Sequence, residues 1–167
     1  MPAAIAFVVV TLVHLGAQAT APGGVLADLT QVLLMPLLAW FLLATTPAPP
    51  SRTVRLVLLA LGLSWLGDTL PRLADDGSTA GPASVLVALL LAQVVYALAL
   101  RGTGLDRVAQ GGVLALVGCD LLVAVRLLGD VELPLHAVWV ALTYVLGHAL
   151  LVAAIAHHDR AARLQAA

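Results

Sequence analysis

Residues 110–128 read QGGVLALVGCDLLVAVRLL, an apolar run with an aspartate, Asp120, near its centre. Arg126 is the only other charged residue in the run. A helix needs about 20 apolar residues to cross the hydrocarbon core of a bilayer, so this segment predicts a transmembrane helix. A carboxyl group at that depth is costly to bury, and such groups are commonly functional. Asp120 is therefore the first candidate for a functional residue.

Similar runs fill most of the chain. Of its 167 residues, 62% are hydrophobic and 10% are charged, which is more apolar surface than a soluble domain of this length can bury. Long apolar runs without period-two alternation predict helices and not barrel strands. We predict one all-α transmembrane domain over residues 1–167. Its six spans are expected at about residues 3–20, 28–46, 54–71, 83–100, 110–128 and 136–156.

Arginines predict the orientation of the bundle, since the chain has no lysine. With a cytoplasmic N-terminus, only Arg72 and Arg126 lie outside. The cytoplasmic set is then Arg52, Arg55, Arg101, Arg107, Arg160 and Arg163. Positive charge favours the cytoplasmic side, so both termini are expected there. The first span lacks a basic leader and a clear cleavage signal, so it is expected to be retained. The amino-acid composition indicates a GC-rich bacterium. The expected location of this multi-pass protein is therefore the bacterial inner membrane.

Polar residues recur on single faces of three predicted helices. The pairs are Ser64 with Asp68, Gln93 with Tyr96, and Tyr144 with His148. Residues three or four apart share a helix face, and polar faces should meet inside a membrane bundle. Asp120 is expected near the midplane and Asp68 nearer the outer surface, at the mouth of a cavity. We expect this cavity to be lined by Asp68, Gln93, Asp120 and His148.

Five short motifs follow one another along the chain. They are Met35-Pro36-Leu37, SWLGD at 64–68, QVVY at 93–96, GGVLALVGCD at 111–120 and TYVLGH at 143–148. In this order they resemble the successive signatures of the YhhN-type lysoplasmalogenase family, over most of the chain. The chain looks like a short, diverged member, because the family typically has eight spans and the match lacks two of them before the GGVLALVGCD motif.

Four positions depart from the family pattern. Met35 stands where lysine is usual, and Cys119 stands where serine is usual. Gln93 and His148 replace the family's histidine and glutamine respectively, which is a reciprocal exchange. One hypothesis is that Gln93 and His148 are hydrogen-bonded partners whose helices have exchanged roles; the alternative is chance substitution.

The resemblance implies a membrane-embedded hydrolase that cleaves the vinyl ether bond of lysoplasmalogens or a related lysolipid. Protonation of the alkene carbon leaves an oxocarbenium ion, which water then attacks, so one acid and one ionised carboxylate are needed. Asp68 and Asp120 are the expected catalytic pair, with the deeper Asp120 as the acid. The residues expected to orient substrate or carboxyl groups are Ser64, Gln93, Tyr96, Tyr144, His148 and Met35.

Structural alternatives exist for both carboxyl groups. Asp68 can pair with Arg72 at i,i+4, and Asp120 can be satisfied by Gln93 or His148 in a polar cluster. Cys119 is expected to be a packing residue. The remaining histidines are expected to be structural or solvated, and they are His14, His136, His157 and His158.

The polar residues are also compatible with other classes of function. Zinc held by Asp68, Asp120, His148 and Ser64 is an alternative, but no span contains a close histidine pair, so no metal or cofactor is expected. Buried carboxylates also suit a lipid carrier or a proton-coupled transporter. The net charge of −1 offers no basic face for nucleic acid, which leaves a membrane lysophospholipid as the expected partner. Oligomeric state is not indicated.

Overall fold

The computed structural model describes residues 2–73, 80–101, 106–129 and 133–166, and within these ranges the chain is helical with no strand. The helices are α1 (Pro2–Thr20), α2 (Val25–Thr45), α3 (Arg52–Leu73), α4 (Ala80–Leu100), α5 (Arg107–Gly129) and α6 (His136–Ala166). Each overlaps one predicted span, so the all-α membrane bundle is confirmed.

Five of the helices are long and apolar enough to cross a membrane. In α4 the described apolar part, Val87–Leu100, is shorter. The whole of α4 has 21 residues, which at 1.5 Å per residue gives about 31 Å, the thickness of a hydrocarbon core. The chain is therefore a multi-pass membrane protein.

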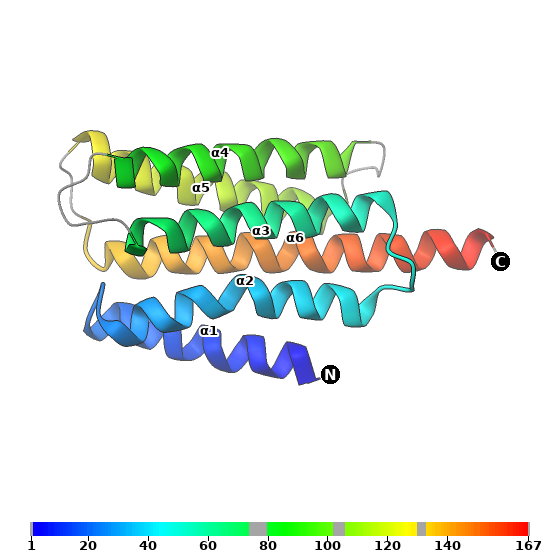
Figure 1. Ribbon diagram of the computed structural model, residues 1–167, viewed down its shortest axis with the longest axis horizontal. Helices are drawn as coiled ribbons and strands as arrows, with labels where there is room; N and C mark the ends of the chain where they lie inside the picture. The colour runs from blue at the N-terminus through cyan, green and yellow to red at the C-terminus, as the bar shows by residue number, and fades with distance from the viewer. Residues whose placement is uncertain (1, 74–79, 102–105, 130–132, 167) are drawn as a thin grey trace.

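The helices run side by side in one bundle, with both termini at the same end (Figure 1). Helix α6 contacts α1, α2, α3 and α5, whereas α4 packs on α3. Among the described residues, α4 and α5 make no direct backbone contact. Termini at one end agree with an even number of spans, but the side of the membrane that they face stays a prediction.

Helix α6 continues beyond residue 156, where the sixth predicted span ends. Arg160 Nε donates to the carbonyl of Thr45 at 2.5 Å, and Arg163 donates to the carbonyl of Pro49 at 2.5 Å. These bonds hold a polar helical extension against the end of α2 and the connection that follows it. Hydropathy indicates where the apolar residues end, but helix α6 continues beyond that point.

Two glycines allow α5 and α6 to approach closely. A Cβ atom on Gly147 would lie 2.6 Å from Cγ of Leu116, and one on Gly112 would lie 2.9 Å from Cγ of Leu151. Small residues at helix interfaces let backbones come together in membranes. The glycines of the GGVLALVGCD and TYVLGH motifs therefore bring the helix of Asp120 against α6.

A hydrogen bond joins α3 to α2 at the carbonyl that Pro36 leaves without a helical partner. Pro36 lies inside α2 and has no N–H, so the carbonyl of Val32 loses its helical partner. The indole N–H of Trp65 on α3 donates to this carbonyl at 3.0 Å. Within a membrane a freed carbonyl must be satisfied by the protein itself. The contact ties α3 to α2 next to a second bond between these helices, from Gln31 to Asp68.

Trp65→Phe should reduce the free energy of unfolding by about 1–3 kcal/mol, because the carbonyl of Val32 is left unpaired. In a Pro36→Ala background an N–H returns to position 36, and the hydrogen-bond part of this loss should disappear. Unfolding of the four proteins in detergent gives the coupling energy. Equal losses in both backgrounds would mean that Trp65 contributes packing alone.

Candidate active site

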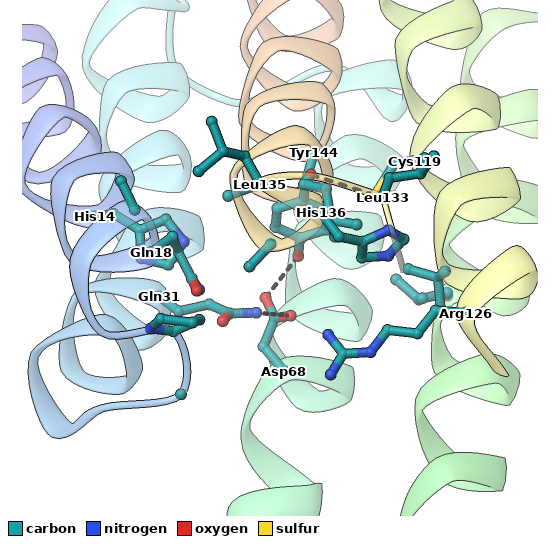
Figure 2. Close-up of a pocket in the computed structure, with 18 residues that line it drawn as sticks. His14, Gln18, Gln31, Asp68, Cys119, Arg126, Leu133, Leu135, His136 and Tyr144 are labelled. Carbon is teal, nitrogen blue, oxygen red and sulfur yellow. Dashed lines mark hydrogen bonds between the residues drawn. The ribbon is translucent and has the colours of Figure 1, made fainter. Parts of the chain in front are cut away.

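A cavity of about 710 Å³ lies at the end of the bundle where α1 ends and α6 begins. This volume is in the range of small-molecule binding sites. All six helices contribute to its wall, together with the turn between α1 and α2 and the segment before α6 (Figure 2). The polar side chains in the wall are His14, Gln18, Gln31, Asp68, Cys119, Arg126, His136 and Tyr144.

Asp68, near the end of α3, presents its carboxylate to this cavity (Figure 2). Nε2 of Gln31 donates to Oδ1 at 2.8 Å, and the hydroxyl of Tyr144 donates to Oδ2 at 2.6 Å. Both oxygens accept, as those of an ionised carboxylate do, and the shorter distance is typical of an O–H group bonded to a charged oxygen. Three helices therefore hold one carboxylate facing the cavity. The side chain of Arg72, its alternative partner, lies outside the described residues.

A buried cluster supports Tyr144 from behind. Nδ1 of His148 lies 2.9 Å from the carbonyl of Tyr144, and since a carbonyl only accepts, Nδ1 carries the hydrogen. Nε2 lies 3.1 Å from the hydroxyl oxygen of Ser64, which donates to it when the ring is neutral. The His148 ring centroid lies 4.4 Å from that of Tyr144 and 5.7 Å from that of Tyr96. Ser64, Tyr96 and His148 thus lie behind the wall, with His148 in contact with the other two and with Tyr144.

Asp120 lies on α5, where its Oδ2 accepts a hydrogen bond from Nε2 of Gln93 at 3.1 Å. Asp120 is not in the cavity wall, but its neighbour Cys119 is. On α4, Leu89 lines the cavity and Gln93 lies four residues along the same helix face. The Gln93–Asp120 pair is therefore about one turn beyond that wall.

The structure thus separates residues that the spacing had grouped. Asp68 lines the cavity, Gln93 and Asp120 form their own pair, and His148 lies behind Tyr144. Gln93 bonds to Asp120 of α5. Since α4 packs on α3 and not on α6, no hydrogen bond joins Gln93 to His148 in the described part of the chain.

Two other expectations concern Met35 and a metal. Met35 is a core residue, 1% exposed, outside the cavity wall. It packs in the same apolar cluster as Leu38 of its own helix and Leu61 of α3. In the ranges that the structure describes, no three His, Cys, Asp or Glu side chains gather closely enough to hold a metal ion.

Six polar residues of the wall were not among the expected site residues. They are His14, Gln18, Gln31, Cys119, Arg126 and His136. His14 has the structural role expected of it, since Nδ1 lies 2.9 Å from Oγ1 of Thr30 and ties α1 to α2, but it also lines the cavity. Isolated polar residues produce no periodic pattern. The available signal was Arg126, one of only two arginines predicted to lie outside.

Comparison with known proteins supports the motif resemblance. The model of the YhhN family matches residues 26–119, a range that includes Met35, Asp68, Gln93 and Tyr96 and ends one residue before Asp120. No curated protein and no solved structure matches the chain. Since the matched range covers more than half of the 167 residues, the chain belongs to the YhhN family.

Proposed function

We propose that this protein hydrolyses the vinyl ether bond of a lysophospholipid in the bacterial inner membrane. The products are a fatty aldehyde and a glycerophospho-alcohol. One observation carries the proposal, namely the Asp68 carboxylate held by two donors in the wall of a cavity inside a membrane bundle. The wall also contains a cation and apolar side chains, as the binding of an amphiphile requires.

The reaction needs an acid and a base. A proton is transferred to the alkene carbon remote from the ether oxygen, using the electron pair of the double bond. The ether oxygen then shares a lone pair with the neighbouring carbon, giving an oxocarbenium ion. Water adds to that carbon and loses a proton, and the resulting hemiacetal releases the glycerol oxygen as an alcohol. Positioned carboxyl groups carry out the equivalent steps in glycoside hydrolysis.

We assign the ionised role to Asp68, because Gln31 and Tyr144 both donate to it. It would stabilise the oxocarbenium ion and accept the proton of the attacking water. Asp120 is the proposed acid. The alkenyl chain would enter between α4 and α5, which lack direct backbone contact, and would bring its alkene carbon beside Asp120.

Isotopic labelling tests the reaction. Purified protein in detergent should convert a lysoplasmalogen in D₂O into an aldehyde that is trapped at once by reduction. One deuterium is expected on the carbon next to the former carbonyl, because the alkene carbon takes its proton from the enzyme. In H₂¹⁸O the label should enter the aldehyde and not the glycerol product. Uptake of intact lipid into vesicles without aldehyde would contradict the hydrolase and favour a carrier.

A further inference from the structure

The start of α6 places a second polar group in the cavity, distinct from Asp68. His136, the first residue of this helix, is only 7% exposed, and neither ring nitrogen has a hydrogen-bond partner in the part of the chain that the structure describes. A buried polar group without a partner is costly. The ring lines the cavity, on the same side as the guanidinium of Arg126 (Figure 2). His136 is therefore placed to meet a ligand.

Arg126 supplies a positive charge beside this histidine. It lies in the last turn of α5, lines the cavity and is exposed. No ion pair joins it to another described residue, so the guanidinium donors remain available. A guanidinium offers five N–H donors in a planar fork that suits phosphate oxygens.

The first turn of α6 adds a backbone donor. The N–H of His136 bonds to the carbonyl of Leu133 at 3.1 Å, and the N–H of Val138 bonds to that of Leu135 at 2.9 Å. Between them, the N–H of Ala137 takes part in no hydrogen bond among described residues, and Ala137 lines the cavity. The N-terminus of a helix carries a partial positive charge and free N–H groups, which together favour anions.

We propose that Arg126, His136 and the N–H of Ala137 bind a phosphoryl oxyanion, the headgroup phosphate of a membrane lipid. Asp68 shares the cavity, but Gln31 and Tyr144 already donate to its two oxygens, so this carboxylate has its own partners. The inference deepens the proposed function and rests on it for the identity of the lipid.

The proposed phosphate site and the Asp68 carboxylate lie along one cavity, in the order that the phosphate and ether of a lysophospholipid follow. Tyr144 lies eight residues after His136 along α6, or about 12 Å by helical rise. Helical side chains lean toward the N-terminus, so the Tyr144 hydroxyl and the Asp68 carboxylate bonded to it lie closer to the start of α6. A three-carbon glycerol unit separates the phosphate from the vinyl ether. A phosphate at the start of α6 therefore places the ether near Asp68.

Binding of a lipid that cannot react tests the site independently of hydrolysis. The probes are a saturated 1-O-alkyl lysophospholipid, which has no alkene to protonate, and the 1-O-alkylglycerol of equal chain length, which lacks the phosphate. Calorimetry of the full-length protein in detergent should show tighter binding of the phospholipid by 10-fold or more. Arg126→Gln should weaken phospholipid binding roughly 10- to 100-fold, the range for a lost hydrogen bond between charged groups, and leave alkylglycerol binding unchanged.

Two further variants make the test specific. Arg107→Gln removes the same charge from the opposite end of α5, where the residue is exposed and outside the cavity wall, and should bind both lipids like wild type. His136→Phe keeps a ring but removes both nitrogens, and should weaken phospholipid binding several-fold. Circular dichroism should show unchanged helicity in each variant.

The outcomes distinguish a lipid phosphate from a soluble one, and the oxyanion site from the proposed hydrolysis. If glycerophosphate competes with the lipid, the site accepts phosphate esters in general. If glycerophosphate does not compete, the site is specific for a lipid headgroup, and either result supports an oxyanion site. Equal affinity of wild type for the two lipids, or wild-type affinity in Arg126→Gln, would overturn it. Phosphate-dependent binding without cleavage of lysoplasmalogen would refute the proposed hydrolysis and leave the oxyanion site standing.

Discussion

Asp68→Asn should lower kcat for lysoplasmalogen about 10²- to 10⁴-fold, the contribution typical of a general acid or base. Asparagine keeps the size of the side chain and can still accept from the hydroxyl of Tyr144. Rotation of the Gln31 amide would present its oxygen to the new NH₂ group, so the fold should survive. The variant nevertheless lacks a carboxylate that can stabilise the cation and accept a proton from water. Aldehyde release under saturating substrate measures the effect.

Asp106→Asn is the matched control for this change. Asp106 precedes α5 at the opposite end of the bundle, and its Oδ1 accepts from the N–H of Ala109 at 2.7 Å. Asparagine caps helices as well as aspartate does, so neither stability nor turnover should change. Wild-type turnover in a folded Asp68→Asn protein would remove Asp68 from the mechanism.

Asp120→Asn should reduce turnover to a similar degree, because asparagine has no carboxylic proton to give to the alkene carbon. The amide oxygen can still accept the hydrogen bond from Gln93, so the link between α4 and α5 is preserved. Gln93→Ala does the opposite, removing the link and keeping the carboxyl group, and should leave most turnover in place. Single-turnover assays with helicity checked by circular dichroism distinguish the two variants.

The reverse order of effects would give Asp120 a different role. If Asp120→Asn is active while Gln93→Ala is not, Asp120 serves only as the acceptor that joins α5 to α4. The acid must then be sought among the side chains that line the cavity.

The helical structure and the positions of the spans were predictable from the sequence, because hydropathy is a local property summed over neighbouring residues. Each predicted span has a helix, and the motif resemblance agrees with the family match. Spacing also placed Tyr144 and His148 on one face, and their rings lie 4.4 Å apart. The residues at which helices end were less predictable, because a helix such as α6 can continue after its apolar residues stop.

Partners across helices depended on the fold. Ser64 and Asp68 share a face of α3, yet Ser64 bonds to His148 while Asp68 bonds to Gln31 and Tyr144. One polar face thus serves two different neighbours, and periodicity cannot say which helix lies opposite each residue. Rotation and register of α3 are set by contacts between distant segments, such as the bond from its tryptophan to the carbonyl freed by the proline of α2.

The amino-acid sequence by itself determined a membrane bundle with carboxyl groups inside its spans, because burial of apolar residues and the cost of buried charge follow from composition and local order. Only the tertiary structure decided that Asp68 faces the cavity and that Asp120 lies about one turn beyond its wall. It also brought the start of α6 with His136 and the end of α5 with Arg126 into the wall of that cavity. The physical reason is that the site is built from side chains of several helices. The contacts that bring these helices together, such as those of the α5 and α6 glycines, join residues far apart in the chain.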